Sequence, residues 1–121
     1  IAPVIAVTAI RAIEIARGRP ELKLRLDRNV RLFRTRMLEA GFDIPEREHP
    51  IAPVMYGDAR LAKEAADCLL AKGVYVIAFS YPVVPKDKAR IRVQLSAAHT
   101  EEHIERAVKA FRVTRDQQGR P

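Results

Sequence analysis

Residues 89–95 alternate between apolar and polar side chains, and this alternation limits the folds open to the chain more than any other feature. Successive side chains of a strand point to opposite faces, so one face of this strand takes three apolar side chains: Ile91, Val93 and Leu95. The opposite face takes polar side chains: Arg90, Arg92, Gln94 and Ser96. A strand with one apolar face predicts a sheet that packs against helices on that side only.

Capping and helix-breaking residues divide the remaining chain into four helices and two further strands. We predict helices at about 3–16, 20–41, 58–72 and 100–113, and strands at 51–56 and 74–77. Pro53 indicates an edge position or a kink for the first of these strands. The loop at 78–88 is too short for a helix, so we expect the strands on either side of it to pair antiparallel. The predicted fold class is α+β, a small and mostly antiparallel three-stranded sheet with helices packed on one face.

The first predicted helix is apolar on nearly all sides, with Val4, Ile5, Val7, Ile10 and Ile13 among its residues. Such a helix requires cover on several sides, and a chain of 121 residues offers little to cover it. The chain also begins without Met and enters an apolar pattern at once. We therefore expect one small domain that lacks a larger body or a partner. Residues 1–17 would form an inter-domain helix, 20–113 the α+β body and 114–121 a frayed tail.

Composition excludes several classes of function. The formal net charge is +7, but the basic residues are spread over helix faces without interleaved aromatic residues, so we predict no binding of nucleic acid. No apolar run approaches the ~20 residues that span a bilayer, so we predict no membrane association. Cys68 is the single cysteine and is predicted to be a buried structural thiol.

Few residues remain as candidates for chemistry. The three histidines do not form a metal set by spacing, and the five glycines are scattered instead of forming a phosphate-binding loop. We predict no metal site, and we find no nucleophile with an obvious base partner. The polar row of the last strand is the exception, because a guanidinium presents a planar pair of donors that suits a carboxylate.

The alternative for that row is a solvated sheet face, which the pattern alone favours. The loop before the strand argues against it, because two prolines stiffen the loop and its centre is apolar. We therefore treat one group of residues as a candidate active-site loop: Pro82, Val83, Val84, Pro85 and Lys86.

Two longer segments carry a family resemblance. Residues 73–86 (GVYVIAFSYPVVPK) and 89–100 (ARIRVQLSAAHT) resemble the C-terminal signature of the glycine C-acetyltransferases, or 2-amino-3-ketobutyrate coenzyme A ligases, within the α-oxoamine synthase family. Residues 37–42 (MLEAGF), 53–55 and 57–59 extend the resemblance, which covers essentially the whole chain.

The resemblance implies the C-terminal domain of a pyridoxal-phosphate enzyme of fold type I that acts as a homodimer, in the bacterial cytoplasm or in mitochondria. It implies condensation of glycine with acetyl-CoA to 2-amino-3-ketobutyrate, or the reverse reaction in threonine breakdown. Arg92 matches the family arginine that binds the substrate carboxylate, whereas Arg90 is expected to be structural or to lie at a domain interface. The cofactor lysine would belong to a large domain before Ile1, so the resemblance implies no catalytic or cofactor-binding residue here and an inactive isolated chain.

The family has glycine at the positions of Ala78 and Asp87, which puts the path of the loop in question if those glycines have positive φ. Two alternatives stay open on sequence alone. One is a free-standing basic α+β binding module without catalysis. The other is a different α-oxoamine synthase, such as an 8-amino-7-oxononanoate synthase.

Overall fold

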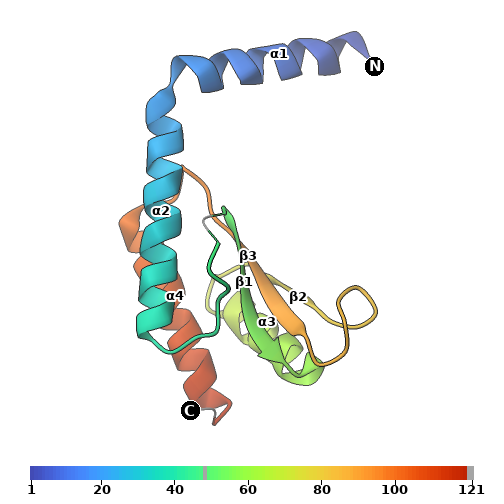
Figure 1. The fold of residues 1–121 in the computed structure, drawn as a ribbon, viewed down its shortest axis with the longest axis vertical. Helices are drawn as coiled ribbons and strands as arrows, with labels where there is room; N and C mark the ends of the chain where they lie inside the picture. The colour runs from blue at the N-terminus through green and yellow to red at the C-terminus, as the bar shows by residue number, and fades with distance from the viewer. Residues whose placement is uncertain (48, 120–121) are drawn as a thin grey trace.

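The computed structural model describes residues 1–47 and 49–119, and these form four helices and three strands (Figure 1). In chain order they are α1 (Pro3–Gly18), α2 (Pro20–Glu39), β1 (Ile51–Gly57), α3 (Ala59–Ala71), β2 (Ile77–Phe79), β3 (Ala89–Gln94) and α4 (Glu101–Gln117). The helices of the body lie against one side of the sheet. The predicted α+β class is confirmed.

The sheet has the strand order β1-β3-β2, with both pairs antiparallel. The predicted antiparallel pairing of the last two strands is therefore confirmed. β1 lies at an edge, as Pro53 indicated. On β3, burial alternates residue by residue and the apolar positions are the buried ones. The strand order places β3 in the centre of the sheet, and the alternation places its polar row on the face away from the core.

The predicted strand at 74–77 is wrong, because β2 begins only at Ile77. The amide of Val74 donates to the carbonyl of Leu69 at 2.8 Å and the amide of Gly73 donates to the carbonyl of Leu70 at 3.0 Å. Gly73 has a φ of +84°, the left-handed conformation that ends many helices. The β-branched run thus starts as the C-terminal cap of α3, and only its last residue reaches β3.

The core fills the space between the buried sheet face and helices α2, α3 and α4. At its centre Phe111 of α4 meets two rings edge-on, Phe33 at 6.4 Å and Phe42 at 5.8 Å between centroids. Phe111 and Phe33 have no exposed surface. Edge-to-face pairs of this kind stabilise a core beyond the area that they bury.

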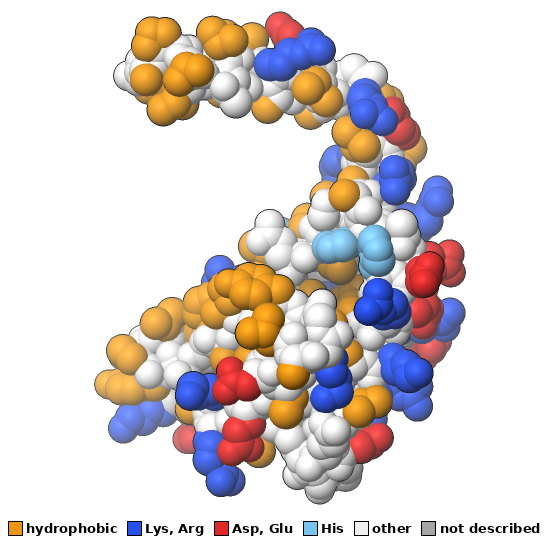
Figure 2. Space-filling view, turned by 180° about the vertical axis from the view of Figure 1, so that it is seen from behind, with side chains coloured by type: hydrophobic (Ala, Val, Ile, Leu, Met, Phe, Trp, Pro, Cys, Tyr) orange, Lys and Arg blue, Asp and Glu red, His pale blue; other side chains and the backbone are white. Residues whose placement is uncertain are grey.

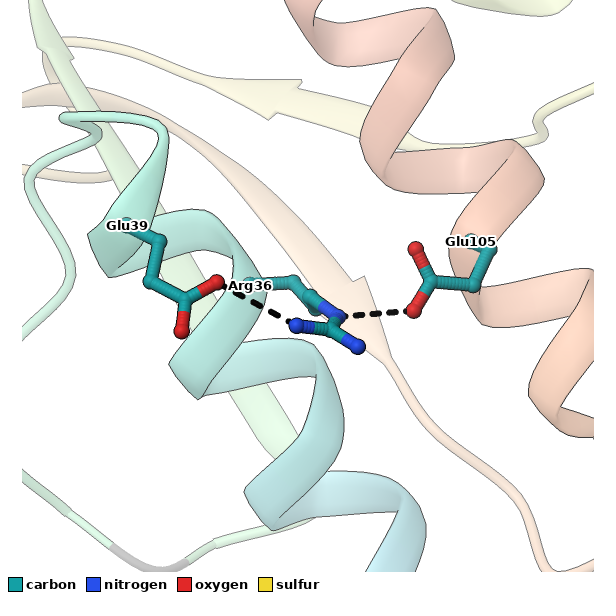
Figure 3. A network of polar contacts seen from close by, with 3 residues as sticks. All are labelled: Arg36, Glu39 and Glu105. Atoms are coloured by element: carbon teal, nitrogen blue, oxygen red, sulfur yellow. Dashed lines mark hydrogen bonds and ion pairs between the residues drawn. The ribbon is translucent and has the colours of Figure 1, made fainter.

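A polar contact also joins α2 to α4 on the outside of this core. The guanidinium of Arg36 lies between two carboxylates, with Nε 2.7 Å from Glu105 of α4 and Nη1 3.3 Å from Glu39 of its own helix (Figure 3). The hydrogen bond with Glu105, and then that with Glu39, raises the pKa of Arg36 above its ordinary value.

The prediction of a frayed tail from Thr114 onward is wrong for the described residues. Helix α4 continues to Gln117, and Thr114 is fully buried. Polar side chains of this last turn bond to the body: Arg115 donates to the carbonyl of Ala40 at 2.5 Å, and Gln118 donates to that of Leu61 at 3.0 Å. This polar segment is ordered because its side chains donate hydrogen bonds to backbone carbonyls of the body.

Helix α1 projects away from the body, across the end of α2 (Figure 1). None of its residues is buried, and hydrophobic side chains gather along it (Figure 2). The exposed apolar side chains include Val4, Val7, Ile10 and Ile13, each more than half exposed. Within the described ranges, no helix combines the length and the hydropathy that crossing a membrane requires.

Candidate functional site

The sheet face opposite the helices carries the predicted site. We call it the open sheet face, and its members are Ile51, Pro53, Met55, Ile77, Phe79, Arg90, Arg92 and Gln94. The register places the polar row of β3 between apolar side chains of both edge strands. The two arginines therefore stand in an apolar setting, with a row of side chains on either side.

Arg92 pairs with Pro53 on β1 and with Ile77 on β2. Its guanidinium carbon lies 4.3 Å from the centroid of the Phe79 ring, a cation–π contact. Among the described residues, no acceptor takes a hydrogen bond from Arg92 and no carboxylate pairs with it. The N–H groups of Arg92 are therefore available to a ligand.

Arg90 has a different environment. It is half-buried, and its Nε donates to the carbonyl oxygen of Lys88 at 3.2 Å. Its cross-strand neighbours are Met55 and Phe79. One side of this guanidinium is thus engaged by the backbone just before β3, and a structural part for Arg90 stays a prediction.

A hollow of about 400 Å³ lies beside Arg92. Its lining includes Tyr75, Ile77, Phe79, Gln94 and Ser96. This volume falls within the usual range of small-ligand sites, roughly 300–1,000 Å³. The hollow combines apolar walls with one charged group, which suits a small molecule that carries a carboxylate.

The candidate loop lies next to this face but does not line the hollow, whose lining comes from residues 75–79 and 92–96. The loop is closed by two backbone hydrogen bonds, from Val84 to Ser80 at 3.2 Å and from Lys88 to Pro85 at 3.1 Å. The ammonium of Lys86 lies 5.2 Å from the centroid of the Tyr81 ring, and Val83 is exposed. A part for this loop in the site stays a prediction.

The two positions at which the resemblance implies glycine, Ala78 and Asp87, differ in backbone conformation. Asp87 has a φ of 61°, in the left-handed region. Ala78 lies within β2 and pairs with Ile91 in the ladder, and it is not among the residues with positive φ. The departure from glycine therefore bears on the backbone at Asp87 only, and Asp is among the residues that adopt this conformation most readily.

The histidines have structural contacts. Nδ1 of His103 accepts the amide of Thr100 at 3.1 Å, and the Thr100 hydroxyl accepts the amide of His103, which together cap α4. Nδ1 of His99 accepts the amide of Ser96 at 3.0 Å. In the described part of the chain, no three His, Cys, Asp or Glu side chains cluster as metal ligands would. Cys68, predicted to be buried, is half-buried.

Residues 1–111 match the family described as aminotransferase class I and II. The chain belongs to the aminotransferase class I and II family.

Relatives of this aminotransferase-family chain carry one recurrent name. This chain is 50% identical to a human mitochondrial 2-amino-3-ketobutyrate coenzyme A ligase over 109 residues, which cover 90% of this chain and 26% of that protein. It is also 50% identical to the Escherichia coli K12 protein of the same name over 111 residues, which cover 92% of this chain and 28% of that protein. The chain thus spans about a quarter of the length of the curated relatives that it matches.

A solved structure extends the match to the fold of this aminotransferase-family chain. A high-resolution structure of SPT with PLP superposes with a TM-score of 0.82 at 28% identity. The superposition covers 94% of this chain and 28% of that one.

The sequence singled out Arg92 as a candidate but not its neighbour Phe79, and the part of Arg92 in a site stays a prediction. The position of Phe79 just before the candidate loop was a signal that could have drawn attention to it. Its position opposite Arg90, however, depends on the register between β2 and β3.

Proposed function

We propose that this chain is the C-terminal domain of a pyridoxal-phosphate-dependent acyltransferase that condenses glycine with acetyl-CoA to 2-amino-3-ketobutyrate. In the cell the reaction would also run in reverse, in threonine breakdown. The names of the relatives at 50% identity support the reaction, and the cofactor in the SPT structure supports pyridoxal phosphate. The intact enzyme would be a homodimer of longer chains, in the bacterial cytoplasm or in mitochondria.

The observation that carries the proposal is the environment of Arg92. Its donors are free of protein partners in the described residues, its guanidinium is supported on an aromatic ring, and a hollow of ligand size adjoins it. A guanidinium and a carboxylate form two parallel charge-assisted hydrogen bonds. We propose that Arg92 holds the carboxylate of glycine in this way.

Two bonds from one planar group would fix the plane and position of the glycine carboxylate. Once the amino group of glycine is held as well, rotation about the C–Cα bond is also restricted, and the direction of the Cα–H bonds is then set. Control of orientation is worth a large part of a catalysed step, because reacting groups must meet in a narrow geometry. Arg92 would thus act as an orienting group and would transfer no proton itself.

The described residues do not fit a pyridoxal-phosphate site. Five lysines are exposed: Lys23, Lys63, Lys86, Lys88 and Lys109. Lys72 is half-buried and donates to Gln117 at 3.0 Å. None of the six lies in the lining of the hollow beside Arg92. The cofactor and its lysine would therefore come from the rest of a longer protein, and this chain alone is expected to form no Schiff base with pyridoxal phosphate.

The test compares two arginines on the same strand of the full-length protein. Arg92→Ala is expected to raise the KM for glycine about tenfold, because the carboxylate of glycine loses two charge-assisted hydrogen bonds. Arg90→Ala is the matched control, since it removes the same charge two residues away and should leave the glycine KM within about twofold. Arg92→Lys should recover little, because an ammonium cannot form the planar pair. Unchanged glycine kinetics in Arg92→Ala would contradict the proposal.

A second assay addresses the alternatives left open by the sequence. Full-length protein that is incubated with glycine and acetyl-CoA should release free CoA, measured by its thiol. Activity with a longer acyl-CoA and none with acetyl-CoA would favour another α-oxoamine synthase. A protein that folds, binds no pyridoxal phosphate and releases no CoA would favour the binding module.

A further inference from the structure

We infer that Phe79 is a positioning residue for Arg92: its ring sets the plane of the guanidinium and thereby the orientation in which a carboxylate is received. The inference rests on the proposed carboxylate-binding function of Arg92. Phe79 lies on β2, whereas Arg92 lies on β3.

The register of the sheet places the two side chains together. Phe79 pairs directly with Arg90, and Ile77 pairs with Arg92. Side chains at alternate positions of a strand share a face, so Phe79 and Arg92 are diagonal neighbours on the open sheet face. Diagonal neighbours are about 7–8 Å apart at their α-carbons, within reach of an aromatic and a long side chain. The guanidinium carbon lies 4.3 Å from the ring centroid, so the two side chains are in contact.

The contact with the Phe79 ring is the contact that orients the head group of Arg92. In the described residues no hydrogen bond or ion pair holds this guanidinium, in contrast to Arg90, whose Nε is bonded to Lys88. A long side chain without polar partners samples many rotamers, and ordering it costs free energy when a ligand binds. Phe79 is half-buried on a strand and therefore offers a fixed surface that reduces this cost.

The same contact selects how a ligand approaches. A ring that covers one face of the guanidinium leaves the N–H groups directed along its edge, in the plane of the group. A carboxylate that accepts two of these bonds must lie in the same plane. Phe79 and Ile77 also line the hollow and exclude water from one side of the pair, which strengthens the attraction between the charges. The ligand class favoured is a small molecule with an unhindered carboxylate, such as a short α-amino acid.

The experiment is a double-mutant cycle in the full-length protein, with glycine as the probe. Four forms are compared: the unmodified protein, Phe79→Leu, Arg92→Ala and the double variant. For each form, the KM and kcat for glycine are measured, together with the Kd for glycine by calorimetry. Phe79→Leu keeps an apolar side chain but removes the flat ring. Met55→Leu on the same face, outside the lining of the hollow, is the control.

We expect Phe79→Leu to raise the glycine KM and Kd about three- to fivefold, the effect of a partly exposed cation–π contact, with a smaller change in kcat. In the Arg92→Ala background the same substitution should change neither constant by more than about 1.5-fold, since its target is gone. Phe79→Tyr keeps the ring and should recover the glycine KM to within about twofold of the unmodified protein. If Phe79→Leu does not fold, Phe79→Met takes its place in the cycle.

The outcomes separate the two proposals. If Arg92→Ala leaves glycine binding unchanged, the proposed function fails. If Arg92→Ala weakens binding but Phe79→Leu has no effect, or has an equal effect in both backgrounds, only the positioning role of Phe79 fails. Equal weakening in both backgrounds with a lower Tm would make Phe79 a structural residue.

Discussion

The side-chain amide of Asn29 on α2 donates a hydrogen bond of 2.9 Å to the backbone carbonyl of Ser96, 67 positions further along the chain. A second bond of 2.9 Å runs from the same nitrogen to the carbonyl of His99. Asn29 is 7% exposed, so water does not readily replace it. This one amide ties the end of β3 to α2, and it therefore holds the strand that carries Arg92.

Replacing Asn29 with Ala removes both bonds and leaves two carbonyl oxygens without this donor. We expect the free energy of unfolding to fall by about 2 kcal/mol, because each buried hydrogen bond contributes about 1 kcal/mol. Urea denaturation followed by circular dichroism measures the change. Arg31→Ala on the exposed side of α2 is the control and should stay within about 0.5 kcal/mol. A loss of the same size in both variants would contradict the role of Asn29.

Among the core residues with ring contacts, we expect substitution of Phe111 to lower the free energy of unfolding most. It has no exposed surface and meets both Phe33 and Phe42 edge-on. Phe111→Ala is expected to lower the free energy of unfolding by about 3–5 kcal/mol, the usual cost of such a cavity. Thermal unfolding by calorimetry tests this, with Arg112→Ala at the next, exposed position as the control. A drop in Tm of only a degree or two would show that the core closes around the gap.

The backbone at Asp87 predicts a ranking of substitutions. Because φ is 61°, Asp87→Gly should be tolerated, whereas Asp87→Val should cost about 1–2 kcal/mol, since a β-branched residue is strained there. The matched pair at Ala78, whose backbone is extended, should show the opposite order, with Ala78→Val tolerated better than Ala78→Gly. Stability curves of the four variants decide between this ranking and a loop that adapts to any residue.

Glu21 provides a pH-dependent contribution at the start of α2. A hydrogen bond from the Arg19 guanidinium at 2.8 Å is the largest cause that lowers the pKa of Glu21, and the backbone amide of Glu21 adds to it. A lowered pKa favours the ionised form in the folded state. Its stabilisation is therefore complete above the ordinary carboxyl pKa near 4.5 and is lost as the pH falls through the folded value.

Carbon-detected NMR titration of the Glu21 carboxyl measures this directly. Arg19→Ala should move the midpoint upward, toward the ordinary value. Arg17→Ala removes a similar charge from the last turn of α1 and should leave the midpoint in place. A Glu21 midpoint that does not respond to the loss of Arg19 would assign the lowered pKa to the helix backbone.

The sequence predicted most elements because their signals are local. Pro20 begins the second helix, Asp58 caps the third, and Thr100 caps the fourth; all three helices begin where they were expected. The two errors have different causes. The run at 74–77 is β-branched, but it starts as the C-terminal cap of α3, through local bonds to Leu69 and Leu70, and only Ile77 reaches β3. The segment after Thr114 is ordered by bonds to Ala40 and Leu61, which are distant in sequence and cannot be found from the composition of the segment itself.

The candidate site divides in the same way. By itself the sequence determined that Arg90 and Arg92 share one face of β3, because the two-residue period of a strand is a property of the local backbone. Only the tertiary structure decided which arginine keeps its donors free. That choice depends on the register that brings Phe79 beside Arg92 and on the turn that presents the Lys88 carbonyl to Arg90. Register and turn geometry are set by the packing of the whole sheet, which no stretch of seven residues contains.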